Sequence, residues 1–156
     1  MSQTLAHQQE ISMTWAELHI DARTLAKQLK NIAPWKGIIA ITRGGLIPAA
    51  LIAQELNIRL IETICISSYE DKSAGIYAKQ SEPELIKTVD GNGQGFLLID
   101  DLVDSGKTAS LVKALLPEAH LATLYAKPAG KAYANSFVKE IAQHQWVIFP
   151  WESKPT

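Results

Sequence analysis

Apolar and polar positions follow two patterns along the chain, one typical of helices and one typical of buried strands. Four apolar residues recur at helical spacing: Leu18, Ala22, Leu25 and Leu29. Thr14 and Glu17 stand just before this stripe at the three-residue spacing of a capping box. The pattern therefore predicts an amphipathic helix that begins at Thr14 and runs for about four turns.

After this helix, apolar runs typical of strands alternate along the chain with segments typical of helices. The run "GIIAIT" at 37–42 is apolar without alternation, which is typical of a strand covered on both faces. Further strands are expected at 59–69, from Phe96 and at 120–126, and further helices at 46–56 and from about Lys107 to Leu116. Alternating strands and helices predict parallel pairing through right-handed crossovers. We therefore expect an α/β fold with an open, mostly parallel twisted sheet flanked by helices.

The segment from Tyr69 to Gly95 carries most of the chain's polar and glycine content between two predicted strands. A connection of this length in a compact domain is usually functional or mobile. The 156 residues contain no internal repeat and no linker that would divide two domains. We therefore expect a single domain over residues 1–156.

Composition and charge narrow the class of protein. Fifteen basic residues against sixteen acidic ones give a net charge of -1, so no basic field exists and we expect no nucleic-acid partner. Cys65 is the only cysteine, which suits a reducing compartment. The N-terminus lacks the basic and apolar regions of a signal peptide, and no apolar run is long enough to span a bilayer. These features predict a cytoplasmic protein.

The stretch "LLIDDLVDSGKTASL" at 97–111 holds the candidate chemistry. Its "SGKT" resembles the end of a P-loop, but Asp101 stands where the first glycine should be and would repel a triphosphate. Ser105, Gly106, Lys107 and Thr108 lie where a turn enters a helix, and free amides there suit one phosphate monoester. The alternative is an ordinary helix cap.

Asp100 and Asp101 are adjacent carboxylates after an apolar strand, an arrangement that is costly unless they meet a cation or sugar hydroxyls. We expect the strand to end at this pair, so that both can serve a diol directly or through Mg²⁺. The alternative is a solvated strand end. A diol or magnesium site beside a phosphate site describes a ribose phosphate.

This stretch resembles the phosphoribosyl pyrophosphate (PRPP) signature of the type I phosphoribosyltransferases. The blocks "WKGIIAITRGGLIPAALIAQELNIR", "TICISSY", "AKPAG" and "QWVIFPW" extend the resemblance to the bacterial xanthine-guanine branch of that family, over most of residues 12–151. It implies transfer of a 5-phosphoribosyl group from PRPP to N9 of guanine, xanthine and, less well, hypoxanthine, in purine salvage. It also implies a Mg²⁺ cofactor and a homotetramer.

The resemblance assigns roles residue by residue. Asp104 is the candidate acid/base near purine N7, and Asp100 and Asp101 contact the ribose hydroxyls, with Asp101 linked to the metal. The peptide before Arg43 can be cis in the family. The residues matched to the donor are Arg43, Gly44, Asp100, Asp101, Leu102, Val103, Asp104, Ser105, Gly106, Lys107 and Thr108.

A small C-terminal part, about 127–156, is matched to base binding. Lys127 would donate to the 6-oxo group, which selects against adenine. Trp146 would stack on the base, Val147 would meet its edge through the backbone, and Asp104 completes the set. A solvated lysine and a core tryptophan are the alternatives for Lys127 and Trp146.

The segment at about 70–95 corresponds to the family's mobile hood, which covers the reacting centre. The family has an arginine there and this chain has none, so Lys72, Lys79 or Lys87 is a candidate replacement. The sequence leaves open the ranking of guanine, xanthine and hypoxanthine. It also leaves open an enzyme that prefers hypoxanthine and guanine, and a non-catalytic sensor of PRPP or a nucleotide. Peripheral association with the inner membrane is implied by resemblance only.

Overall fold

The structure is a computed structural model that describes residues 9–67 and 82–152. Within these residues a six-stranded sheet has the strand order β4-β3-β2-β5-β6-β7. Its strands are β2 (Gly37–Thr42), β3 (Ile61–Ser67), β4 (Glu84–Lys87), β5 (Phe96–Val103), β6 (His120–Ala126) and β7 (Ser136–Glu140). All neighbours pair in parallel except β3 and β4, which are antiparallel. The predicted open, mostly parallel α/β sheet is confirmed.

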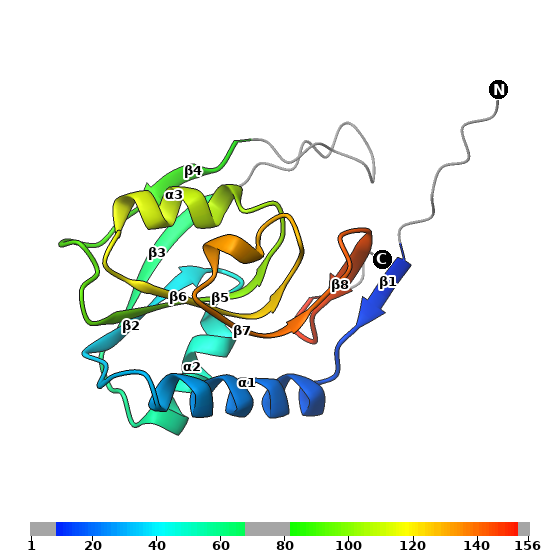
Figure 1. Ribbon diagram of the computed structural model, residues 1–156, viewed down its shortest axis with the longest axis horizontal. Helices are drawn as coiled ribbons and strands as arrows, with labels where there is room; N and C mark the ends of the chain where they lie inside the picture. The colour runs from blue at the N-terminus through cyan, green and yellow to red at the C-terminus, as the bar shows by residue number, and fades with distance from the viewer. Residues whose placement is uncertain (1–8, 68–81, 153–156) are drawn as a thin grey trace.

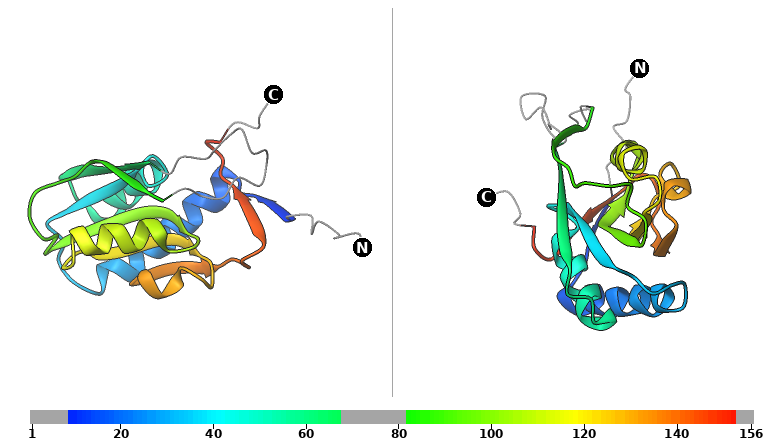
Figure 2. Two further views of the ribbon diagram at one scale, coloured as in Figure 1. Left: turned by 90° about the horizontal axis from the view of Figure 1, so that it is seen from above. Right: turned by 90° about the vertical axis from the view of Figure 1, so that its left-hand side faces the viewer.

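Helices cover both faces of this sheet. The helices α1 (Trp15–Lys30) and α2 (Leu46–Leu56) lie on one face, and α3 (Lys107–Leu115) lies on the other with the short 3-10 helix η2 (Lys131–Tyr133) (Figure 1). The two further views show the same layers (Figure 2). This arrangement gives two apolar cores. One lies between the sheet and the helices α1 and α2, and the other lies between the sheet and α3. Among the described residues, no helix has the length and apolar character needed to cross a membrane.

The apolar stripe of α1 is fully buried, as its spacing predicts: Leu18, Ala22, Leu25 and Leu29. The capping box is present, because Glu17 N donates to Thr14 Oγ1 at 3.1 Å and Thr14 N donates to Glu17 Oε2 at 2.9 Å. Two backbone amides at the N-terminal end of α1 that lack partners within the helix are thus satisfied by local side chains. This helix start was correctly predicted from two residues.

A buried polar group fixes α1 to the sheet. Tyr125 Oη, in β6, donates to Asp21 Oδ2 at 2.6 Å, and Lys139 Nζ, in β7, lies 3.0 Å from Asp21 Oδ1. Asp21 is 2% exposed, so both of its oxygens find partners inside the protein. Burial and the neighbouring Asp21 carboxylate raise the pKa of Tyr125 far above its usual range, so the phenol stays protonated.

Two features differ from the sequence-based expectations. The strand β5 continues through Asp100 and Asp101 to Val103 instead of ending at the acid pair. Pairing with β2 stops at Ile99, whereas pairing with β6 continues to Val103, so only one neighbour is lost at the acids. In addition, the segment expected to form a hood over about 70–95 contains β4, which adds an antiparallel edge to β3.

The two ends of the described chain meet in a separate ribbon. The strands β1 (Gln9–Ser12) and β8 (Gln145–Ile148) pair in parallel, and Met13 N donates to Ile148 O at 2.9 Å. Figure 1 shows this ribbon beyond the end of the main sheet, at the side where the chain leaves β7. The ribbon positions β8, which carries Trp146 and Val147.

Candidate active site

Three loops lie together at the carboxyl ends of the parallel strands. They follow β2 at 43–45, β5 at 104–106 and β6 at 127–130. The strand order runs outward in both directions from the β2–β5 pair, so the chain's direction across the sheet reverses there. Open α/β sheets bind ligands at such a switch point.

The loop after β2 approaches the acid pair closely. A Cβ atom on Gly44 would lie 2.6 Å from Asp101 Oδ2, so only glycine fits at this position without movement of the carboxylate. The Thr42–Arg43 peptide is cis, as the resemblance predicts. Arg43 itself is exposed at the rim. The loop after β2 therefore supplies a cation, Arg43, and the backbone amide of Gly44 at this rim, as an anionic leaving group requires.

Asp100 and Asp101 are adjacent and both are partly buried. Asp101 N donates to Asp100 Oδ1 at 2.9 Å, and Leu102 N donates to Asp101 Oδ1 at 2.7 Å. Burial raises the pKa of Asp101 to about 6, and the nearby Glu152 carboxylate acts in the same direction. Burial and the charge of Asp101 raise the pKa of Asp100 well above its usual value. Such a pair favours the arrival of a cation or of donor hydroxyls, which lower the cost of ionisation.

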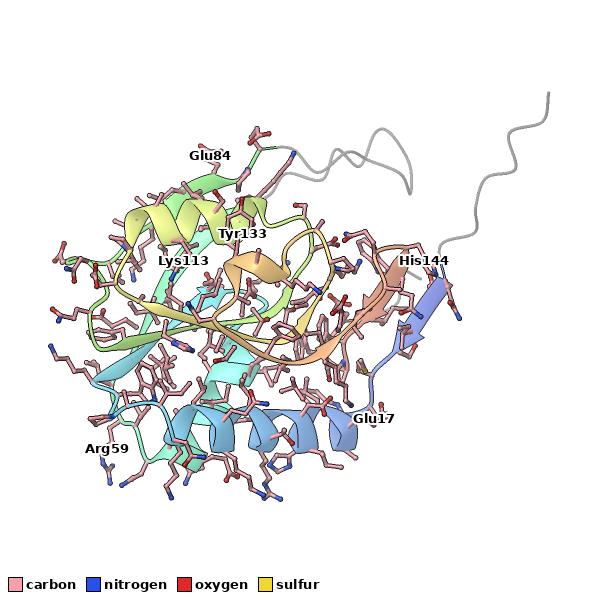
Figure 3. All side chains as sticks on the ribbon, viewed as in Figure 1. Glu17, Arg59, Glu84, Lys113, Tyr133 and His144 are labelled. Carbon is pink, nitrogen blue, oxygen red and sulfur yellow. The ribbon has the colours of Figure 1, made fainter. Side chains whose placement is uncertain are left out.

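The loop after β5 forms a small pocket at the start of α3. Gly106 has a φ of +88°, and a Cβ there would lie 2.6 Å from the ring of Tyr133. Tyr133 is the last residue of η2 and is labelled on the side of η2 that faces α3 (Figure 3). The pocket is lined by Ile41, Asp100, Leu102, Val103, Asp104, Ser105, Gly106, Lys107, Thr108, Ala109, Leu121 and Thr123. It combines the amides of a helix start with hydroxyl side chains, which suits a single phosphate group.

Asp104 and Lys127 form an ion pair across two loops. Lys127 Nζ lies 3.0 Å from Asp104 Oδ2, with side-chain exposures of 2% for Lys127 and 32% for Asp104. Lys127 N also donates to Val103 O at 2.9 Å, which holds the two loops together. Gln143 Nε2 donates to the second Asp104 oxygen, Oδ1, at 2.8 Å. A buried ammonium and a held carboxylate thus stand side by side beside the phosphate-type loop.

Comparison with known proteins identifies this arrangement. Residues 14–155 match the family described as the phosphoribosyl transferase domain. The chain belongs to the phosphoribosyltransferase family. It is 51% identical over 154 residues to the xanthine-guanine phosphoribosyltransferase of Nitratidesulfovibrio vulgaris strain DP4, covering 99% of this chain and 91% of the relative. It is 52% identical over 142 residues to the enzyme of the same name from Desulfotalea psychrophila, covering 91% and 86%.

Solved structures show the same fold. The purine phosphoribosyltransferase from Pyrococcus horikoshii superimposes with a TM-score of 0.75 at 26% identity, covering 94% of this chain and 96% of that one. The xanthine-guanine-hypoxanthine phosphoribosyltransferase from Helicobacter pylori gives a TM-score of 0.71 at 23% identity, covering 92% and 94%. The predicted membership of the xanthine-guanine phosphoribosyltransferases is confirmed at the level of the family.

The residues predicted for the phosphoribosyltransferase site fall into two groups. The structure brings the donor set and the Asp104–Lys127 pair to one rim of the sheet. Trp146 and Val147 lie in β8, where Trp146 is 43% exposed and Val147 is 5% exposed. The indole therefore has exposed surface, whereas the Val147 side chain is packed into the apolar core. Their roles in base binding stay predictions.

The hood lysines are placed only in part. Lys87 lies in β4, and its Nζ donates to Thr63 O at 2.7 Å. That bond ties Lys87 to the neighbouring strand β3. Lys72 and Lys79 lie outside the described residues. Lys107, the other cation near this edge, pairs with Glu82 Oε1 at 3.3 Å.

The residues matched to PRPP include carboxylates that could hold a magnesium ion. The described residues contain no cluster of three or more His, Cys, Asp or Glu side chains that would hold a metal alone. Mg²⁺ in phosphate enzymes is usually held by one or two carboxylates together with water and substrate oxygens. The Asp100–Asp101 pair supplies two such carboxylates, so the residues present fit a shared magnesium site.

Sequence reasoning missed two residues at the rim. Gln143 contacts Asp104, and the carboxylate of Glu152 contributes to the electrostatics of Asp101. Gln143 lies in a short polar turn and Glu152 follows the apolar residues 149–151, and neither periodicity nor composition marks a functional residue at these positions. The signal that could have indicated Gln143 was its place three residues before Trp146.

Proposed function

We propose that the protein is a purine salvage enzyme that transfers 5-phosphoribosyl from PRPP to N9 of guanine and xanthine, and less well of hypoxanthine. The products are GMP, XMP or IMP, and pyrophosphate. One observation carries the choice of base: the buried Lys127 ammonium lies 3.0 Å from the Asp104 carboxylate at the rim of the sheet. A fixed donor beside a fixed acceptor fits the neighbouring 6-oxo and N7 positions of an oxopurine.

The base is recognised through this pair. Lys127 donates to the 6-oxo oxygen. In adenine a 6-amino group takes the place of this oxygen, so two hydrogen-bond donors would face each other and the buried ammonium would lack an acceptor on the base. Asp104 takes or shares the proton that the purine loses as N9 becomes nucleophilic. Trp146 offers its exposed indole for stacking on the purine, and Val147 meets the edge of the base through its backbone.

The donor occupies the two loops on either side of the acid pair. The 5′-phosphate binds the amides and hydroxyls of 105–108, the ribose hydroxyls bind Asp100 and Asp101, and pyrophosphate binds Arg43 and the Gly44 amide. The bond between C1′ and the pyrophosphate oxygen breaks and the bond between N9 and C1′ forms. Asp101 would hold Mg²⁺ together with substrate oxygens, and the ion would supply positive charge that stabilises the leaving pyrophosphate. Arg43 stabilises the same charge from the protein side.

Two alternatives stay in competition with this proposal. An enzyme that prefers hypoxanthine and guanine would use the same 6-oxo contact, and the two differ in turnover with xanthine. A sensor with this fold would bind PRPP or a nucleotide without turnover. The ion pair of Asp104 and Lys127, placed for proton and carbonyl contacts, favours the enzyme over the sensor.

The proposal includes a homotetramer in the cytoplasm, with peripheral inner-membrane association as a further candidate. Several large apolar side chains are exposed on the single chain, among them Ile20, Ile32, Leu60 and Ile86. Such residues support association with further copies. Sedimentation equilibrium tests the tetramer, and a monomer at micromolar concentration would contradict it.

The experiment that tests the reaction is identification of the products. The protein is incubated with PRPP, Mg²⁺ and either guanine or xanthine, and the nucleotides are separated by chromatography beside authentic GMP and XMP. We expect GMP or XMP and pyrophosphate in equal amounts. Binding of PRPP without nucleotide from any oxopurine would support the sensor and overturn the enzyme.

A further inference from the structure

We propose that Gln143 is a positioning residue that holds the Asp104 carboxylate in its reactive orientation. The inference rests on the proposed function and goes beyond the residues assigned to it. Gln143 Nε2 donates to Asp104 Oδ1 at 2.8 Å, and Gln143 Oε1 accepts from Ala129 N at 2.9 Å. Both ends of one amide are therefore used between the acid/base residue and the loop after β6.

The contact matters because Asp104 has only two side-chain partners in the described structure. Lys127 Nζ holds Oδ2 at 3.0 Å and Gln143 holds Oδ1, so the plane of the carboxylate is fixed from both sides. When an oxopurine binds, one N–H group of the Lys127 ammonium donates to the 6-oxo oxygen. Gln143 then remains the donor that keeps Asp104 from rotating away from N7, and the charged acceptor strengthens that bond.

The same side chain connects the parts of the base site. Its bond to Ala129 N fixes the turn in which Gly130 N donates to Lys127 O at 3.0 Å. Gln143 also lies three residues before Trp146, in the turn that leads into β8. Figure 3 labels the next residue, His144, at this end of the molecule beside β8. Gln143 thus links Asp104, the turn after Lys127 and β8, the strand that carries Trp146.

The amide satisfies both contacts because it carries a donor for the Asp104 carboxylate and an acceptor for the Ala129 N–H. In Gln143→Glu a carboxylate would face Asp104 Oδ1, so the orientation is lost and like charges repel. In Gln143→Met the length is kept and both bonds are removed. Gln145→Met is the matched control, since Gln145 makes its bonds to Ala142 N and Gln9 and none to the site.

The test is a double-mutant cycle on kcat/KM for guanine. Gln143→Met is expected to lower kcat/KM by about 10- to 100-fold, mainly in kcat, and Gln143→Glu by more. Gln145→Met stays within about twofold. In the Asp104→Asn background, adding Gln143→Met should cost less than about twofold, because the group that it positions no longer ionises. An equal loss in both backgrounds would overturn the proposal, since Gln143 would then act through the Ala129 turn.

A structural measurement separates this inference from the proposed function. In a crystal structure of Gln143→Met, the Asp104 carboxylate is expected to rotate from its present orientation, while Gln145→Met leaves it in place. A carboxylate that keeps its orientation in Gln143→Met would overturn the positioning role whatever the activity. Absence of turnover in the wild-type protein would instead count against the proposed function, and the rotation of Asp104 would still decide the role of Gln143.

Discussion

Lys127 Nζ lies 3.0 Å from Asp104 Oδ2, although the two residues are 23 positions apart and belong to loops after different strands. Lys127 is one of the most deeply buried residues of the described chain, and an ammonium group in such a place needs a partner. Asp104 provides that partner. In the proposed function a substrate carbonyl would share the ammonium, so the stability of the rim and the proposed choice of substrate would depend on the same pair.

Replacing Lys127 by alanine tests the choice of substrate. The variant is expected to lose about 10- to 100-fold in kcat/KM with guanine, xanthine and hypoxanthine alike, because all three present the same 6-oxo oxygen. Lys131→Ala is the control, since Lys131 pairs with Glu140 at 3.2 Å on the exposed surface. A loss confined to xanthine would contradict the 6-oxo assignment.

Asp104→Asn tests the acid/base role. Asparagine keeps the size of the side chain and can still accept from Lys127 or Gln143, so the variant should fold, with a lower melting temperature because the buried Lys127 ammonium loses its counter-charge. Turnover with guanine should fall by about 100-fold or more, because the group no longer takes a proton. The exposed residue Asp90 supplies the control variant Asp90→Asn. Unchanged steady-state turnover in Asp104→Asn would remove Asp104 from the acid/base role.

In the absence of ligand, the ionised Asp101 carboxylate should lower the free energy of unfolding. The pKa of Asp101 is raised from 3.8 to about 6, so the folded protein binds the proton more tightly than the unfolded chain. The cost is absent below pH 3.8, grows as the pH rises towards 6, and is complete above 6. Asp101→Asn, neutral at every pH, should therefore unfold with a free energy higher by about 1–3 kcal/mol at pH 7.5.

This gain should disappear near pH 3.5 in urea denaturation followed across pH, because the wild-type carboxyl is then protonated in both states. The same variant should bind PRPP with Mg²⁺ more weakly, since a carboxylate has been removed from the donor site. A wild-type protein that is more stable than Asp101→Asn at pH 7.5 would show that ionised Asp101 is not costly in the fold.

The local part of the structure follows from the sequence. Thr14 and Glu17 marked the first helix, and apolar runs located β2 and α2 with their observed bounds. These elements are specified by neighbours within a few residues, through capping and buried apolar stripes. The cis peptide before Arg43 was also predicted, but by resemblance and not by any local pattern.

Long-range pairing explains what the sequence did not reveal. The ribbon of β1 and β8 joins Ile11 to Val147, and no short-range pattern records such a partner. The extension of β5 past Asp100 depends on pairing with β6 after β2 has diverged. Gln143 gains its importance only when the turn before β8 folds against Asp104. In each case the deciding contact lies far away in sequence.

Tyr125→Phe tests the buried group that fixes α1 to the sheet. Removal of the hydroxyl takes away the 2.6 Å bond to Asp21 and leaves a buried carboxylate with one partner fewer. The free energy of unfolding in urea should fall by about 1–3 kcal/mol, with kcat/KM unchanged. Tyr133→Phe is the control, because Tyr133 is 42% exposed and its ring is kept. Equal stability of the two variants would contradict the role of this bond.

Initial rates of pyrophosphate release from PRPP and Mg²⁺ with guanine, xanthine, hypoxanthine and adenine test the proposed selection of oxopurines. Turnover is expected with guanine and xanthine, slower turnover with hypoxanthine, and none above background with adenine. Turnover with adenine at a rate near that of guanine would contradict the selection of oxopurines by Lys127 and Asp104.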